Sequence, residues 1–587
     1  MRALSVVVAL SVSSLVLAGC LGGDDGRSGG ADPVVERAGL SEVRFEVLPG
    51  VSVWIDASSD DTRLHTRLFL PDRASDPEWR APTILVMSPY FGNDAREDEM
   101  DASSAPSYYR YRWLIDNFVP RGYAVAFSDV RGTGDSGGCL EQTAELQRQD
   151  GHDVVEWLAA EEWSNGKVGM FGKSYDAETQ QGTAITTPPH LTTIVPVASV
   201  SGQYEWNFYD GVPFTLHTLV GNLAYMAGDG LQPPTTTEGV IQYPTRVGCH
   251  PMMLAQAAHR DGDWDEYWRV REFRPHVDAI EASVLYVHGL QDWNVRHVAI
   301  RDWFDRIPSE KRAIFGQWAH DYPEENRWER DWSRQDWRET VHKWYDHWLL
   351  GLDNGIMEDL PPVQIQDSAG VWRSEPTYPP TDATESVFHL ADGAMTHNDT
   401  DIPSPLLFRE NDEAFLRAQG IPVEDQDSGA AATRLVFVSE PLAETLHVSG
   451  WPLLDMVVTL SDGLYPDPDE LIDAHFAANL YRIGPDGTET WYNAGYLSAR
   501  HRDGVDRPAD VREDVAIEYT LRFHPEDTVL ENGTRLKLVL SGSDRQTEVE
   551  GSFFAAALSD GALRLPVIER EWEAVTLDVP LGDPIDS

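Results

Sequence analysis

The chain has 587 residues, more than one ordinary domain holds, so two or three domains are expected. Hydrophobic residues make up 41% of it, which excludes a largely disordered chain. Its formal net charge of -51 argues against nucleic acid or an anionic membrane surface as a partner. The charge predicts a solvated acidic surface. Adaptation to high salt is an alternative hypothesis, which a melting temperature independent of salt would exclude.

The N-terminus predicts export. Residues 1–20 begin with one arginine, continue as an apolar run about 15 residues long and end in Leu-Ala-Gly-Cys20. The run is too short for a comfortable membrane span, and its end resembles the bacterial and archaeal lipobox. We therefore expect a lipoprotein signal, lipidation at Cys20, a flexible tether over residues 21–43 and an extracytoplasmic, membrane-anchored protein. An ordinary signal peptide with a chance cysteine is the alternative.

Two further cysteines follow, Cys139 and Cys249. Exported proteins commonly pair their cysteines, because the compartment is oxidising. A disulfide between them is slightly favoured over two free buried thiols.

Residues 44–355 alternate short apolar runs with helical patterns, which predicts a parallel sheet wrapped by helices. Helices are expected at Asp150–Glu161 and Asp331–Leu350. A long aromatic interval at 201–278 predicts an inserted helical cap over the carboxyl edge of the sheet, where such folds bind ligands. The expected strands are Thr83–Met87, Tyr123–Phe127, Val168–Phe171, Ile194–Val197, Ser283–Val287 and Arg312–Phe315.

Residues 356–587 have a different sequence pattern. Alternating apolar and polar residues are separated by Asp, Gly and Pro turns, and no helical period is evident. This pattern predicts an all-β sandwich, most simply a jelly roll. Strands are expected at Arg434–Val438, Met456–Leu460, His475–Tyr481 and Arg535–Leu540.

The segment Gly172-Lys-Ser174-Tyr-Asp176 directly follows a predicted strand. A sharp strand-to-helix turn would expose the Ser174 hydroxyl above the sheet, as in a nucleophile elbow. Asp176 occupies the position where the G-x-S-x-G pattern has its last glycine. A structural serine is therefore the alternative on this motif alone.

A serine nucleophile needs a base and a carboxylate that orients it. Asp292 follows the predicted strand Ser283–Val287, and His320 follows the next one, Arg312–Phe315. The order Ser, Asp, His is that of the α/β-hydrolases. Taken alone, Asp292 could be a turn or cap residue and His320 a surface histidine, but together with Ser174 they predict a triad. His297 is the rival base.

Five motifs occur in order, and together they resemble the Xaa-Pro dipeptidyl-peptidase and cocaine-esterase (CocE/NonD) family of α/β-hydrolases, peptidase family S15. The resemblance runs from about residue 45 to the C-terminus and implies a galactose-binding-like β-sandwich. The motifs are Ser88–Tyr90, Asp129–Ser136, Gly172–Asp176, His288–Asn294 and Gly316–His320.

The resemblance implies a triad of Ser174, Asp292 and His320. Its oxyanion donors would be the Tyr90 hydroxyl and the backbone N–H of Tyr175, the latter also expected from the elbow itself. One departure is Ala177, where the family usually has glycine. The elbow would be strained if that position required a positive φ.

The elbow and the Asp292 loop look more like the peptidase members, so release of N-terminal Xaa-Pro dipeptides is the expected activity. Trp206 and Tyr209 are candidates for an apolar proline slot, and Glu205 or Asp210 for binding the free amine. A role in the cap core or surface is equally open for these four. An ester or amide hydrolase and an inactive glycan-binding lipoprotein are the alternative functions. No metal or organic cofactor is expected.

Overall fold

The computed structural model describes most of the chain. The described residues are 39–73, 78–91, 111–214, 236–249, 262–325, 333–399, 402–409, 433–462, 473–542 and 554–575. The predicted signal, Cys20 and most of the predicted tether therefore lie outside them. Among these residues, none of the helices combines the length and the apolarity that a membrane crossing requires.

The N-terminal domain contains a ten-stranded sheet with the order β1-β2-β4-β3-β5-β6-β9-β10-β11-β12. The strands from β4 to β11 run parallel, and antiparallel strands lie at both edges. The bounds are β1 Val51–Asp56, β2 Arg63–Phe69, β3 Ala81–Ser88, β4 Ala124–Asp129, β5 Ser164–Lys173, β6 Leu191–Val197, β9 Ser283–Gly289, β10 Lys311–Gly316, β11 Val363–Gln366 and β12 Trp372–Glu375.

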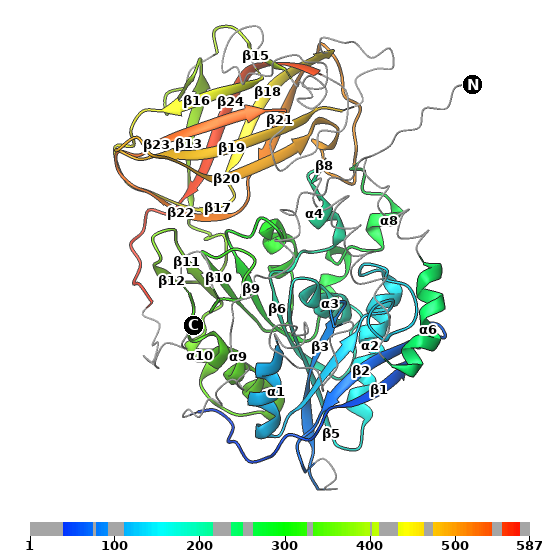
Figure 1. Cartoon of the computed structure of the whole chain (residues 1–587). Coiled ribbons are helices and arrows are strands. Elements are labelled where there is room, and N and C mark those ends of the chain that lie inside the picture. The colour runs from blue at the N-terminus through cyan, green and yellow to red at the C-terminus, as the bar shows by residue number, and fades with distance from the viewer. Residues whose placement is uncertain are drawn as a thin grey trace, which may run out of the picture.

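Helices cover both faces of this sheet (Figure 1). One face packs on α2 through Val154 and Leu158, and the other packs on α1 and α9 through Trp113 and Trp344. Both apolar layers are almost fully buried, so the parallel strands read as continuous apolar runs. The helices are α1 Arg112–Phe118, η5 Val119–Arg121, α2 Glu145–Ala160, α3 Tyr175–Ala184, η8 His297–Ala299, η9 Ile300–Phe304, α9 Trp337–Tyr345, η11 Asp346–Leu350 and α10 Ile356–Asp359.

All six strands predicted in this domain are present. Two helix starts differ from the prediction: α2 begins at Glu145, and α9 begins at Trp337. Beyond the predicted domain boundary at 355/356, β11 pairs with β10 and β12 pairs with β11, so both strands extend the first sheet. Each has four residues that mix polar and apolar side chains, which hides them among the antiparallel strands that follow.

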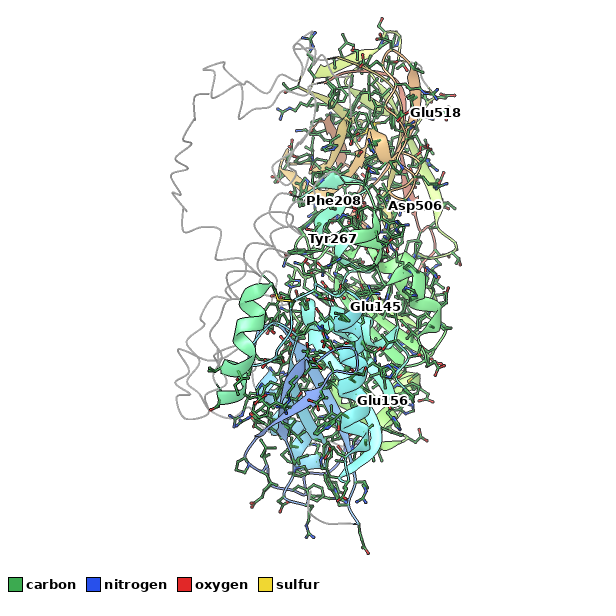
Figure 2. The ribbon with its side chains drawn as sticks, turned by 90° about the vertical axis from the view of Figure 1, so that its right-hand side faces the viewer. Glu145, Glu156, Phe208, Tyr267, Asp506 and Glu518 are labelled. Atoms are coloured by element: carbon green, nitrogen blue, oxygen red, sulfur yellow. A yellow bond between two sulfur atoms is a disulfide. The ribbon has the colours of Figure 1, made fainter. Side chains whose placement is uncertain are left out.

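The cap is only partly helical. Its described elements are α4 Gln203–Asn207, the hairpin of β7 Phe208–Tyr209 and β8 Val212–Pro213, α6 Thr237–Gly248, α8 Glu266–Arg269 and η7 Arg274–Ala279. Figure 2 shows the cap residues Phe208 and Tyr267 between Glu145 of α2 and Glu518 of the second domain. The part of the cap around α4, the hairpin and α8 therefore lies where the two domains meet, whereas α6 lies beside β1 and β2 (Figure 1).

The second domain is the predicted all-β sandwich. Its longest strand, β24, alternates buried and partly buried residues along its length, and nearly all strand pairs are antiparallel. A separate apolar core fills the domain. The elements are β13 Thr384–Ala391, β14 Ala394–Thr396, β15 Leu406–Arg409, β16 Arg434–Ser439, β17 Leu446–Gly450, β18 Leu453–Asp462, β19 His475–Ile483, β20 Glu489–Ser498, η12 Ala499–His501, β21 Ala516–Arg522, β22 Glu526–Leu530, β23 Arg535–Ser541 and β24 Phe554–Val567.

Candidate active site

The turn around Ser174 has the backbone of a nucleophile elbow. Strand β5 ends at Lys173, α3 begins at Tyr175, and Ser174 between them has φ 65° and ψ -130°. A non-glycine residue in this region is strained, and such strain is concentrated at functional sites. Gly172 is required because a Cβ there would lie 2.5 Å from Asp176 Cβ. The turn therefore presents Ser174, which is half-buried, at the carboxyl edge of the sheet.

The two departures from the usual elbow pattern are accommodated. Asp176 is buried, and the Tyr111 hydroxyl donates to its Oδ2 at 2.5 Å. Ala177 lies inside α3 and has no positive φ. The position therefore requires only a small side chain, and the methyl group of alanine fits there.

Asp292 lies in the loop after β9 and is completely buried. Its Oδ1 accepts hydrogen bonds from the backbone N–H groups of Asn294 and Val295, at 3.0 and 2.8 Å. Burial alone would raise the pKa of this carboxyl, but the attraction of His320 and the hydrogen bonds of His288 and His320 outweigh burial. The pKa of Asp292 lies well below its ordinary value. Asp292 is thus a fixed anion.

His320 lies in the loop after β10, and its Nδ1 is 2.8 Å from Asp292 Oδ2. Its side chain is 23% exposed, whereas Asp292 has no exposure. A buried carboxylate that accepts from Nδ1 sets the tautomer of the ring, so Nε2 is the nitrogen able to take a proton. Asp292 and His320 are thus in hydrogen-bond contact, as a triad would require.

The rival base His297 has another environment. It is fully buried, and its Nε2 lies 2.8 Å from the backbone oxygen of Pro525 in the sandwich. Burial, reinforced by the nearby His288, lowers the pKa of His297 to about 3. A neutral histidine whose Nε2 is engaged by the other domain joins the two domains and cannot serve as the base.

The two predicted oxyanion donors flank the elbow. Tyr90 follows β3, and its ring meets that of Tyr175 edge-on with centroids 6.4 Å apart. Tyr175 is the first residue of α3, where backbone N–H groups have no partner within the helix. The Tyr175 hydroxyl donates to Gln147 Oε1 at 2.9 Å, which fixes the ring away from the turn.

The four predicted substrate contacts have different surroundings. Glu205 is buried and forms an ion pair with Arg274 at 2.9 Å, and Trp206 packs against Val295 of the Asp292 loop. The Tyr209 hydroxyl donates to the backbone oxygen of Arg522, and its ring packs on the sandwich. The backbone oxygen of Asp210 accepts from the N–H of Ser498 at 3.0 Å. Glu205 and Trp206 are thus close to the acid loop, whereas the hairpin residues Tyr209 and Asp210 contact the other domain.

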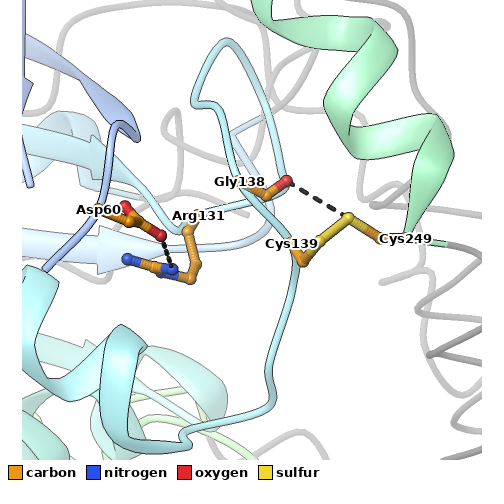
Figure 3. The surroundings of a disulfide bond; sticks show 5 residues. All are labelled: Asp60, Arg131, Gly138, Cys139 and Cys249. Carbon is orange, nitrogen blue, oxygen red and sulfur yellow. Dashed lines mark hydrogen bonds and ion pairs between the residues drawn. A yellow bond between two sulfur atoms is a disulfide. The ribbon is translucent and has the colours of Figure 1, made fainter.

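Cys139 and Cys249 form a disulfide with Cα atoms 5.7 Å apart. Figure 3 shows that it joins the loop after β4 to the end of cap helix α6. On the same loop, Arg131 bonds Asp60 at 3.0 Å and Asp150 at 2.5 Å. The loop is therefore fixed on the sheet side by ion pairs and on the cap side by the disulfide.

Sequence reasoning missed one residue of the base loop, Gln317. Its Nε2 donates to the backbone oxygen of Asp527 in β22 at 3.2 Å, and its Oε1 accepts from Gln291 at 3.0 Å. Gln291 precedes Asp292, so Gln317 joins the acid loop, the base loop and the sandwich. Its place within a recognised motif, Gly316–His320, was the only available signal.

Two protein-family models match the chain in succession. The model of X-Pro dipeptidyl-peptidase (S15 family) matches residues 60–322, and that of the X-Pro dipeptidyl-peptidase C-terminal non-catalytic domain matches residues 354–551. Together they cover well over half of the chain. The chain belongs to the X-Pro dipeptidyl-peptidase (S15) family. It is accordingly a hydrolase with a C-terminal β domain.

Relatives agree with this placement. A Streptomyces avermitilis protein assigned as an Xaa-Pro dipeptidyl-peptidase is 28% identical over 76% of this chain and 66% of its own length. One from Bacillus cereus is 24% identical over 88% of this chain and 89% of its own. The Xaa-Pro dipeptidyl-peptidase of Streptococcus gordonii is 24% identical, and the chain spans 60% of its length.

Solved structures share the fold. A CocE/NonD family hydrolase from Staphylococcus aureus has a TM-score of 0.67 at 18% identity, covering 89% of this chain and 94% of that one. An α-amino acid ester hydrolase has the same score and identity over 93% of this chain and all of that one. An aminopeptidase from a Thaumarchaeota archaeon has a TM-score of 0.65 at 16% identity, covering 93% of this chain and all of that one.

Proposed function

We propose that this hydrolase is a serine peptidase that releases Xaa-Pro dipeptides from peptide N-termini, with Ser174, Asp292 and His320 as its triad. The observation that carries the proposal is the 2.8 Å contact between His320 Nδ1 and buried Asp292 Oδ2, in loops at the same sheet edge as the strained turn of Ser174. The Xaa-Pro dipeptidyl-peptidase relatives support the substrate class.

The proposed mechanism is acyl transfer in two steps. Ser174 Oγ attacks the carbonyl carbon of the proline residue while His320 Nε2 takes its proton, and the Tyr90 hydroxyl and Tyr175 N–H stabilise the oxyanion. The C–N bond then breaks as His320 returns the proton to the leaving amine. Water attacks the acyl-enzyme, again with His320 as base, and the dipeptide leaves with a free carboxylate.

A dipeptidyl-peptidase must bind a free ammonium group at a fixed distance from its nucleophile. Glu205 is the better candidate of the two acids, because it precedes Trp206, which packs on Val295 of the Asp292 loop. Its buried carboxylate contacts Arg274 at 2.9 Å and accepts from the Ser201 hydroxyl at 2.6 Å, and a substrate ammonium would share these oxygens. Trp206 is the better candidate for the proline slot. Tyr209 and Asp210 remain proposed contacts at the rim of the site. Replacing Glu205 with Gln should raise KM for a substrate with a free N-terminus and leave that for a simple ester unchanged.

The deciding experiment compares an Xaa-Pro p-nitroanilide with a simple aryl ester. We expect turnover of the anilide, loss of that turnover when the N-terminal amine is acetylated, and no turnover by S174A. Hydrolysis of the ester alone would instead support the second candidate, an ester or amide hydrolase. The α-amino acid ester hydrolase fold favours that candidate. Failure of the wild type to turn over either substrate would support the glycan-binding lipoprotein.

We also propose that the protein is exported and anchored through lipidated Cys20, so that its membrane partner is reached through the anchor alone. The Cys139–Cys249 disulfide supports this, because disulfides persist in oxidising compartments outside the cytoplasm. Wild-type protein should fractionate with membranes, and C20S should not. Equal membrane association of both would contradict the anchor.

A further inference from the structure

The residue before the nucleophile reaches the loop that carries the base. Lys173 ends β5, and its Nζ donates to the backbone oxygen of His320 at 2.8 Å. The same ammonium lies 5.1 Å from the centre of the Tyr322 ring, in position for a cation–π interaction. Lys173 thus contacts the base residue and the residue two positions after it.

The residue two positions after the nucleophile reaches the same loop from the other side. Asp176 accepts from the Tyr111 hydroxyl, and the Tyr322 hydroxyl lies 3.4 Å from that of Tyr111. The Tyr322 ring is stacked on Phe171 of β5 at 5.7 Å, with an angle of 4° between the planes. The elbow and the base loop are therefore joined on both sides of Ser174.

We propose that Lys173 is a positioning residue that holds His320 in register with Ser174. The inference rests on the proposed triad. His320 lies on a loop and is partly exposed, so its backbone needs a fixed point. Because Lys173 is covalently next to Ser174, its bond to the His320 oxygen ties the base directly to the nucleophile. A small displacement of a reacting group can cost a factor of about 100 in rate.

The choice of residue supports this role. Only five of the 46 basic residues are lysines, and Lys173 is one of them. A lysine ammonium is compact and can point three donors at separate acceptors, whereas the planar guanidinium of arginine is wider. Lysine thus suits a half-buried place between a carbonyl oxygen and an aromatic face.

A second lysine provides a matched control. Lys167 lies on the same strand, and its Nζ donates to the backbone oxygen of Trp348 at 3.1 Å. Both lysines therefore extend from β5 and donate to a backbone carbonyl of another segment. Only Lys173 bonds the base loop, so a general effect of losing a lysine from this strand would appear in both variants.

The test compares K173M, K173R and K167M with the wild type. We measure the rate of labelling by a fluorophosphonate and the melting temperature. We also measure kcat and KM on whichever of the Xaa-Pro p-nitroanilide and the aryl ester the wild type hydrolyses faster. K173M should lower the labelling rate and kcat by about 10- to 100-fold with KM nearly unchanged. K173R should recover part of the loss, because it restores a cationic donor but places a wider group there. K167M should behave as the wild type in both rates.

Wild-type labelling and kcat in K173M, or an equal loss in K167M, would overturn the proposal. A loss in K173M that follows a lowered melting temperature and is not recovered by K173R would also overturn it. Failure of the proposed triad gives a different result, since either the wild type would remain unlabelled or S174A would still be labelled. Ser174-dependent labelling with an unaffected K173M refutes only the role of Lys173.

Discussion

The proposed nucleophile and its two proposed partners are supported from different parts of the molecule. The elbow is held within its own domain, by Gly172, Tyr111 and the strands beside β5. The loops of the acid and the base also contact the sandwich, through Gln317 to the oxygen of Asp527 and His297 to that of Pro525. The second domain, named non-catalytic in its family model, is therefore part of the support of the proposed site.

The largest effect is expected from breaking the interdomain ion network. Asp527 Oδ1 lies 2.6 Å from both Arg373 Nη1 and His447 Nε2, and all three side chains are buried. Removing one partner of a buried pair typically costs about 3–5 kcal/mol. D527N should therefore unfold at much lower urea concentration and lose activity with it. D486N, in an exposed turn of the same domain, is the control, and equal midpoints for both variants would contradict this account.

Loss of the disulfide should lower stability within the N-terminal domain. Cys139 and Cys249 are 110 residues apart, and removing a native disulfide typically costs about 2–5 kcal/mol. We expect C139S/C249S to melt at a lower temperature than the wild type while labelling at the wild-type rate below its transition. Reducing agent should shift the wild-type melting curve and leave that of the double variant in place. A reduced labelling rate in the folded variant would show that the loop also supports the site.

A smaller effect should show whether the sandwich supports the proposed site or only the stability of the fold. Q317L removes the bonds to Asp527 and Gln291, and also the 2.9 Å bond to the backbone oxygen of Gln366. We expect kcat to fall about tenfold, which corresponds to about 1.4 kcal/mol in the barrier. Stability should fall by only about 1 kcal/mol. Gln335, which is exposed, provides the control Q335L. Unchanged kcat in Q317L would mean that the sandwich supports folding alone.

A further effect is a dependence on pH that both regions share. Burial raises the pKa of Glu178 on α3 to about 8, and burial does the same for Glu526 on β22. Between about pH 4.3 and pH 8 the unfolded chain ionises these groups while the folded chain keeps them protonated. Their contribution is thus fully present below pH 4.3 and is lost as pH rises through 8.

The melting temperature of the wild type should accordingly fall between pH 5 and pH 9. E178Q and E526Q should each show a shallower fall, one from each domain. A slope identical to that of the wild type in either variant would show that its carboxyl does not hold a proton in the folded state.

The strands and the order of the site residues could be predicted because each signal is local. Short apolar runs followed by glycine mark β5, β9 and β10, and Ser174, Asp292 and His320 each follow one of them. The end of the first sheet could not be predicted, because β11 is identified only by its pairing with β10. The partners of Lys173 and Gln317 are set by packing between distant segments, which no local pattern records.

The most direct test of the account is to locate the fluorophosphonate adduct by mass spectrometry. We predict one modified residue, Ser174, with labelling abolished in S174A and strongly reduced in H320A. A wild-type protein that remains unlabelled, or an adduct on another serine, would contradict the proposed triad.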